Sequence, residues 1–135
     1  MKIYSGMIEL DYDPATDILT TSMPDLREFS LPEVKMCLEI VVSNIRNYDI
    51  KKLLLDSSGS VVEIDDEAYK AVVAKFTMDL MATRLKKLAR VATTSPAREQ
   101  KSTKLANEIR QEFRTTVEFA NFPSKPEALK WLLED

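Results

Sequence analysis

The hydrophobic positions near the start of the chain alternate with polar ones, as they do in a strand that buries one face. Ile8, Leu10 and Tyr12 are separated by acidic residues, which gives a period of two. A turn at 13–17 contains a proline and two aspartates, and apolar residues resume at 18–23. The pattern predicts an N-terminal β-hairpin.

Helical spacing and short apolar runs alternate along the rest of the chain. Leu53, Leu54 and Leu55 form an uninterrupted apolar run, which is typical of a strand buried on both faces in the middle of an α/β sheet. Helices are expected at 30–48, 65–83, 95–114 and 124–133, and strands at 52–56, 88–93 and 116–119.

Three of these helices have a recognisable start. Ser30 and Ser124 are each followed three residues later by a glutamate, which fits a capping box. The second helix opens with Asp65, Asp66 and Glu67, whose carboxylates complement the positive end of the helix dipole. These starts support the helix assignments.

The predicted order of elements is β-β-α-β-α-β-α-β-α, with about four helices. Strands that alternate with helices are joined by crossover connections, so the later strands are expected to be parallel and the hairpin to add an antiparallel pair. No linker divides the 135 residues, so we expect one α/β domain over 1–135 with a mixed β-sheet.

Three scarce residue types exclude several classes of protein. The absence of histidine rules out a Ser-His-Asp triad, a Cys-His pair and a histidine-based metal site. Two glycines cannot build a GxGxxG or Walker-type phosphate loop. The single cysteine, Cys37, lies on the apolar stripe of the first helix and is expected to be an inert core thiol. No catalytic set, metal site or cofactor is expected.

The start of the chain turns acidic without a long apolar segment, unlike a secretory signal. The longest uninterrupted apolar run is 71–74, far short of the roughly 20 residues of a membrane span. We therefore expect a cytoplasmic protein that is not an integral membrane protein.

The net charge of −3 conceals a separation along the chain. Residues 84–114 carry nine basic and three acidic residues, a balance of +6, whereas 1–83 carry eight and fifteen, a balance of −7. Such polarity can steer an anionic partner or support contacts between copies, although a solvated helix face is the simpler interpretation. Nucleic acid is disfavoured by a pI of about 5.1 and by the lack of aromatic residues between Arg84 and Glu112.

Four stretches follow one another in an order found in a known family. They are 1–4 before an acidic strand that ends in Tyr12-Asp13, then 52–56, 87–92 and 122–132. Together they span nearly the whole chain, and their layout resembles the STAS fold of sulphate transporters and anti-sigma factor antagonists. More closely than the wider family, it resembles the small stand-alone STAS-like proteins of bacteria. It implies a module whose partner-facing region is the loop 57–66 and the start of the second helix.

In the antagonist members of that family, a serine in an Asp-Ser-Ser-Gly stretch at the start of a helix is phosphorylated. Here 56–59 has those letters but directly ends a strand, whereas Asp65 and Asp66 stand at the helix start. By layout these aspartates occupy the phosphoacceptor loop, and an aspartate cannot accept phosphate from a serine kinase. Ser57 and Ser58 are interpreted as turn residues, with a switch serine as the less favoured alternative. Ser57, Ser58, Asp65 and Asp66 are the candidates for partner binding.

A second candidate site follows the strand at 88–93. Thr93, Thr94 and Ser95 stand where strand carboxyl ends and helix N-termini meet, with Arg98 close by, and such groups can bind an anion or a small polar ligand. Serine and threonine are also the residues that caps and turns select, which is the favoured interpretation.

The end of the second helix gathers three large apolar residues, Met78, Leu80 and Met81. Because one buried face does not readily hold all three, a hydrophobic groove or a homodimer contact is a second hypothesis there. Taken together, the patterns favour a non-enzymatic interaction or regulatory module that binds a protein partner. The alternative is a carrier of a small anionic or lipid-like ligand, since some STAS-like relatives are thought to bind lipids. An enzyme ranks third.

Overall fold

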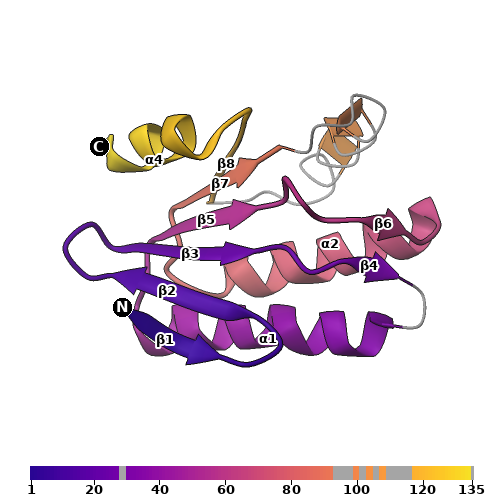
Figure 1. Cartoon of the computed structure of the whole chain (residues 1–135), viewed down its shortest axis with the longest axis horizontal. Helices are drawn as coiled ribbons and strands as arrows, with labels where there is room; N and C mark the ends of the chain where they lie inside the picture. Colours follow the sequence, from indigo (N-terminus) through magenta and orange to yellow (C-terminus); the bar gives the residue numbers. More distant parts are fainter. Residues whose placement is uncertain (28–29, 93–98, 101–102, 105–106, 109–116, 135) are drawn as a thin grey trace.

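A six-stranded mixed sheet forms the centre of the computed structural model, which describes residues 1–27, 30–92, 99–100, 103–104, 107–108 and 117–134 (Figure 1). The strand order across the sheet is β1-β2-β3-β5-β7-β8. The strands are β1 (Lys2–Ser5), β2 (Glu9–Asp13), β3 (Ile18–Ser22), β5 (Lys52–Asp56), β7 (Lys87–Val91) and β8 (Glu118–Phe122). β1, β2 and β3 pair antiparallel, and β3, β5, β7 and β8 pair parallel, which confirms the predicted hairpin and the parallel later strands.

Helices cover both faces of the sheet. Helices α1 (Leu31–Asn47) and α2 (Asp66–Met81) lie on one face, and α4 (Lys125–Leu133) lies on the other (Figure 1). Between β7 and β8, residues 99–100, 103–104 and 107–108 are helical, in line with the helix expected at 95–114. The rest of that expected helix lies outside the described residues. In the described part, no helix is long and apolar enough to cross a membrane.

Three strands were not expected from the sequence. β1 extends the hairpin to a three-stranded antiparallel unit. Two short strands, β4 (Leu26–Arg27) and β6 (Val62–Glu63), pair parallel as a separate two-stranded sheet. Each of the three is four residues or fewer, too short for a periodic pattern to develop. The last strand is β8 rather than 116–119, because its register with β7 runs from Glu118 to Phe122, next to Pro123.

The two predicted capping boxes are wrong in detail. Ser30 and Ser124 occupy the N-cap positions of α1 and α4, but neither side chain makes a capping hydrogen bond. The Ser30 hydroxyl instead donates to the Arg27 carbonyl at 3.1 Å and accepts from the Arg27 amide at 3.3 Å. The Ser30 hydroxyl therefore hydrogen-bonds within the preceding turn and does not cap α1.

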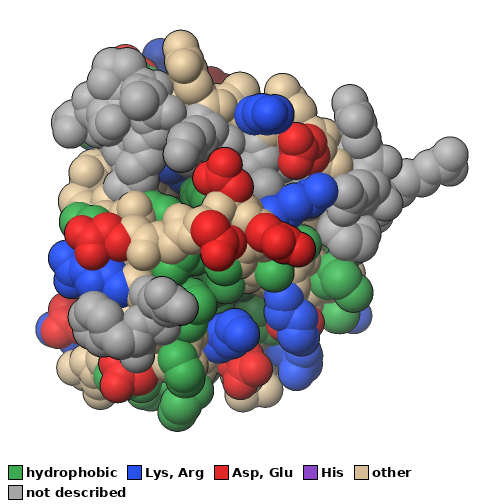
Figure 2. Space-filling view, turned by 90° about the vertical axis from the view of Figure 1, so that its right-hand side faces the viewer, with side chains coloured by type: hydrophobic (Ala, Val, Ile, Leu, Met, Phe, Trp, Pro, Cys, Tyr) green, Lys and Arg blue, Asp and Glu red, His purple; other side chains and the backbone are tan. Residues whose placement is uncertain are grey.

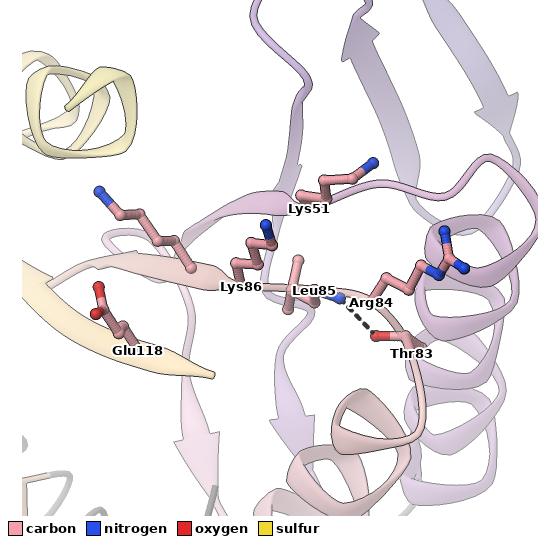
Figure 3. Close-up of a pocket in the computed structure, with 7 residues that line it drawn as sticks. Lys51, Thr83, Arg84, Leu85, Lys86 and Glu118 are labelled. Atoms are coloured by element: carbon pink, nitrogen blue, oxygen red, sulfur yellow. Dashed lines mark hydrogen bonds between the residues drawn. The ribbon is translucent and has the colours of Figure 1, made fainter. Parts of the chain in front are cut away.

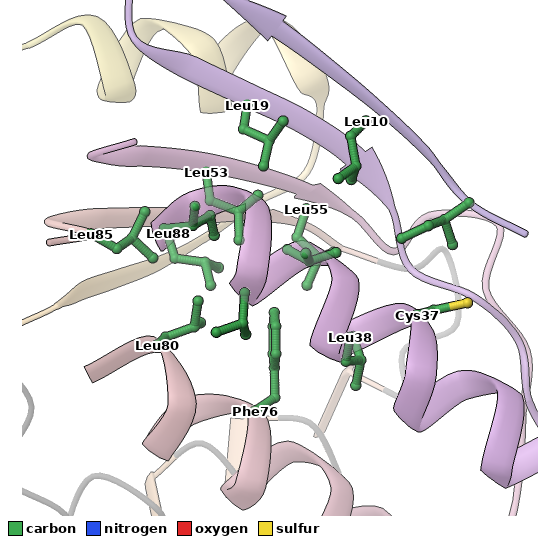
Figure 4. Close-up of a cluster of buried hydrophobic side chains, with 14 of the residues drawn as sticks. Leu10, Leu19, Cys37, Leu38, Leu53, Leu55, Phe76, Leu80, Leu85 and Leu88 are labelled. Carbon is green, nitrogen blue, oxygen red and sulfur yellow. The ribbon is translucent and has the colours of Figure 1, made fainter. Parts of the chain in front are cut away.

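The central strand β5 contributes to two hydrophobic cores. Leu53 and Leu55 pack into the larger core, between the sheet and helices α1 and α2 (Figure 4). Leu54 points to the opposite face and joins the smaller core beneath α4, with Ala128 and Leu132. The prediction of a strand buried on both faces is confirmed.

Burial bears on two further expectations, those for Cys37 and for the end of α2. Cys37 is 3% exposed, and burial raises the pKa of its thiol, as expected for an inert core thiol. Leu80 is fully buried, whereas Met78 is 49% exposed. The core therefore takes up Leu80 and leaves Met78 at the surface, and a hydrophobic groove or a homodimer contact at the end of α2 stays a hypothesis.

Candidate partner-binding surface

The loop that follows β5 is held in a fixed conformation by hydrogen bonds to its own strand and to β7. The amide of Ser57 donates to the Val91 carbonyl at 3.0 Å, and the amide of Met23 donates to the Asp56 carbonyl at 2.8 Å. The amide of Ser60 donates to the Ser57 carbonyl at 3.2 Å, which closes a four-residue turn. The loop therefore leaves the carboxyl end of the sheet in a defined direction.

Asp56 organises the first residues of this turn. Its Oδ1 accepts from the amide of Ser58 at 2.9 Å and from the Ser58 hydroxyl at 2.6 Å. Ser58 and Gly59 are exposed, whereas Ser57 is only 3% exposed. The structure thus brings the two predicted serines into a turn at the strand end, one buried and one at the surface.

The second half of the loop is attached to the segment 24–27, which lies 36 residues earlier in the chain. The Ser60 hydroxyl donates to the Pro24 carbonyl at 3.1 Å, and Asp25 Oδ1 accepts from the Val61 amide at 2.8 Å. Arg27 then donates from Nε to Glu63 Oε2 at 3.2 Å and lies 3.5 Å from the other oxygen of Asp25. These contacts build the small β4–β6 sheet, so the loop is preformed.

Asp65 ends the loop and starts α2. It is the N-cap residue, and its Oδ1 accepts from the Ala68 amide at 2.7 Å. Asp66 and Glu67 follow in the first turn, and all three acidic side chains are exposed. The sequence placed Asp65 inside the first turn; the structure places it one position earlier, as the cap.

The result is an acidic face at the carboxyl end of β5. We call the carboxylates of Asp25, which is half-buried, and of the exposed residues Glu63, Asp65, Asp66 and Glu67 the acidic face. Figure 2 shows this side of the molecule, with acidic side chains gathered across its middle and basic ones beside them. Asp65 and Asp66, predicted as candidates, lie within the acidic face, and Ser58 lies in the loop that leads to it.

Sequence reasoning missed Asp25, Arg27 and Glu63, which fasten and extend this face. Their partners lie 36 residues away along the chain, and no local motif signals such a contact. The other predicted candidates, Thr93, Thr94, Ser95 and Arg98, lie outside the described residues.

The chemistry of the surface is ionic. The Asp65 carboxylate is engaged in capping, and Asp25 is engaged with an amide and with Arg27. Across the described ranges, no group of three or more histidine, cysteine, aspartate or glutamate side chains is placed to hold a metal ion. What this face offers is a fixed arrangement of carboxylates with Arg27 among them and further basic side chains beside them.

The sequence matches no family model and no curated protein. Among solved structures, the chain is similar to an uncharacterized protein of the DUF3478 family from Shewanella loihica PV-4, which has a SpoIIAA-like fold. The TM-score is 0.55 and the identity 20%, over 93% of this chain and 91% of that one. This likeness shows the fold: the chain is a mixed α/β protein with the SpoIIAA-like, or STAS-like, fold, as the layout of its sequence predicted.

Proposed function

We propose that the protein is a non-catalytic interaction module that binds a protein partner with a basic surface. The binding region is the loop 57–66 together with the start of α2. The observation that carries the proposal is that this loop is fastened at both ends and presents the acidic face in a set geometry. It coincides with the region that is partner-facing in the family that the sequence resembles.

Two physical arguments favour binding over other uses of this face. A preformed loop loses little conformational entropy when a partner docks, so more of the contact energy appears as affinity. Five carboxylates against Arg27 attract a basic partner and speed the encounter.

Regulation at this face differs from a serine switch. Asp65 and Asp66 carry permanent charge at the start of α2, where a phosphoserine would carry regulated charge. Ser57 is buried, so its modification requires the turn to open, and the Ser58 hydroxyl is bonded to Asp56. Binding that depends on fixed charge responds to ionic strength instead.

The test is affinity capture from an extract of the native cell, followed by reconstitution with the purified partner. The double variant Asp66→Lys/Glu67→Lys reverses charge on the acidic face and leaves the Asp65 cap in place. The matched control Glu39→Lys/Glu127→Lys makes the same change in net charge at exposed sites on α1 and α4.

We expect the first variant to weaken the purified complex by about tenfold or more, and the control by less than about twofold. The complex of the unaltered protein should also weaken as salt is added. Equal affinities for the two variants would contradict the proposal, and so would the failure of any partner to reconstitute.

A further inference from the structure

An open depression of about 650 Å³ lies at the end of the sheet where β5 and β7 begin, which is the end opposite the acidic face. The residues that line it include Lys51, Arg84, Leu85, Lys86, Lys87 and Glu118 (Figure 3). The volume is within the range of small-molecule sites, about 300–1,000 Å³, but those sites are mostly apolar. Here Leu85 is the one apolar side chain among the described lining residues, and it is 3% exposed. We call this region the basic depression.

The backbone of the depression is already hydrogen-bonded. The amides of Lys86 and Lys87 both donate to the Lys51 carbonyl, at 2.8 and 3.1 Å. The amide of Leu85 donates to the Thr83 hydroxyl at 3.2 Å. A ligand is therefore recognised there by side chains rather than by a nest of free amides.

The positive charge of the depression is only partly neutralised. One carboxylate, that of Asp49, serves two cations: it lies 3.4 Å from Lys51 Nζ and 3.3 Å from Arg84 NH1. Lys51 also lies 3.8 Å from Asp17. Lys86 is exposed and forms no ion pair with any described residue.

A second row of charge lies beside the first. Lys52 and Lys87 are register partners on the parallel strands β5 and β7, and like charges in such a position repel. Lys87 is held in place because its Nζ donates to the carbonyls of Trp131 and Glu134 at the end of α4. Glu118, the register partner of Lys87 on β8, offsets part of this charge.

We propose that the basic depression binds a phosphate group, carried by a small metabolite or by a lipid headgroup. Figure 3 shows Lys51, Arg84 and Lys86 extending to the same side of the strand ends. A guanidinium fits two phosphate oxygens at once, and the ammonium groups add point charges. Against the carboxylates of Asp49 and Asp17, the three cations leave a net positive charge that attracts an anion. Because the depression is open to solvent, it holds the phosphate and leaves the rest of the ligand outside.

The first experiment is an NMR titration of the ¹⁵N-labelled chain with inorganic phosphate. Saturable shifts are expected at the amides of Lys51 and of residues 83–87. The variant Arg84→Ala/Lys86→Ala should weaken binding by about tenfold, and the control Lys35→Ala/Lys130→Ala, with the same loss of charge at exposed sites, by less than about twofold. Equal weakening in both variants, or shifts spread over the whole surface, would overturn the site.

A gain-of-function variant keeps the test valid if the loss-of-charge variant fails to fold. Asp49→Asn removes the competing carboxylate, and asparagine tolerates the positive φ of 54° at this position. Phosphate should bind several-fold more tightly to this variant. Unchanged or weaker binding would count against the proposal.

The two sources of phosphate are separated with vesicles. If the site takes a headgroup, the chain binds phosphatidylcholine vesicles that contain phosphatidic acid, and inorganic phosphate competes. If it takes a free metabolite, phosphate binds and the vesicles do not. Concentration-dependent self-association that Arg84→Ala/Lys86→Ala abolishes, with no phosphate binding, would assign the depression to a second copy and refute the proposal. Partner binding at the acidic face is independent of all these outcomes.

Discussion

Arg90 and Glu99 form a bidentate ion pair. Arg90 NH1 donates to Glu99 Oε1 at 2.9 Å, and NH2 donates to Oε2 at 3.2 Å. The side chains are 15% and 24% exposed, so water screens them only partly. With the contact of 3.6 Å between Lys70 and Glu108, the pair connects the helical residues after β7 to β7 itself and to α2.

Removing this ion pair is expected to destabilise the fold. Arg90→Gln and Glu99→Gln should each lower the free energy of unfolding by about 1–3 kcal/mol, because each leaves a partly buried charge with a weaker partner. In a double-mutant cycle measured by urea unfolding, the coupling should exceed about 1 kcal/mol. The exposed pair Lys75–Asp79, at 2.8 Å on α2, is the control and should give about 0.5 kcal/mol or less. Equal couplings would contradict the role given to the Arg90–Glu99 pair.

The N-cap side chain of α2 should contribute more to the free energy of unfolding than that of α4. Asp65→Ala removes the bond to the Ala68 amide and should cost about 1 kcal/mol of unfolding free energy. Ser124→Ala removes an N-cap side chain that makes no capping bond, so its cost should stay below about 0.5 kcal/mol. The reverse order in thermal unfolding would show that the two caps are assigned wrongly.

Asp25 should hold the loop 57–66 more strongly than Glu63 does. Asp25→Ala leaves the Val61 amide without its acceptor, and we expect a loss of about 1–2 kcal/mol and faster hydrogen exchange in the loop. Glu63→Gln weakens only an exposed contact with Arg27, worth about 0.5 kcal/mol or less. Comparable exchange rates in the two variants would argue against a fastened loop.

Tyr12 gives a specific dependence on alkaline pH. Its hydroxyl donates to Asp17 Oδ1 at 2.7 Å, and chiefly this bond, with burial and nearby carboxylates, raises the pKa of Tyr12 to about 12. The unfolded value is about 10, so the native state retains the proton longer. The stabilisation is complete below about pH 10 and is lost as the pH rises through about 12.

The check is the free energy of unfolding across that pH interval. Tyr12→Phe should flatten the decline between about pH 10 and 12 relative to the unaltered protein. Asp17→Asn keeps an acceptor, tolerates the positive φ of 58°, and should lower the pKa of Tyr12 in an absorbance titration. An unchanged tyrosine titration in Asp17→Asn would remove Asp17 as the cause.

Truncations of the apolar residues at the end of α2 should differ sharply in how much they lower the free energy of unfolding. Leu80→Ala opens space in the larger core and should cost about 2–5 kcal/mol. Met78→Ala, at an exposed position, should cost about 0.5 kcal/mol or less. A large cost at Met78 would show that this side chain takes part in packing or in contacts between copies.

The fold was predictable from the sequence where periodic burial is strong. The run Leu53 to Leu55 predicted a strand covered on both sides, and the layout predicted the STAS-like fold. The small β4–β6 sheet was not predictable, because pairing of Arg27 with Glu63 depends on contacts far apart in the chain. At Ser30 the expected cap failed for a local reason, because the hydroxyl donates to the carbonyl of Arg27, three residues earlier.

The candidate surfaces were predictable to different extents. The resemblance in layout put Asp65 and Asp66 at the start of the second helix, and they are the N-cap and the first residue of α2. Their role in partner binding stays a prediction. The basic depression had a partial signal in the positive charge of 84–114, but Lys51 joins it only because β5 and β7 start side by side. The charge of each segment can be counted from the sequence, but the pairing of the strands determines which charged residues lie next to one another.

The acidic face and the basic depression lie at opposite ends of β5, a strand of five residues that spans about 17 Å. Negative charge at one end of β5 and positive charge at the other make the molecule electrically polar along this strand. A negatively charged surface draws the amino ends of β5 and β7 towards itself, and the acidic face then points away from it into solvent. Under the two proposals, one molecule binds a basic partner at the acidic face and a phosphate at the basic depression, and the sheet between them fixes how the two are oriented relative to each other.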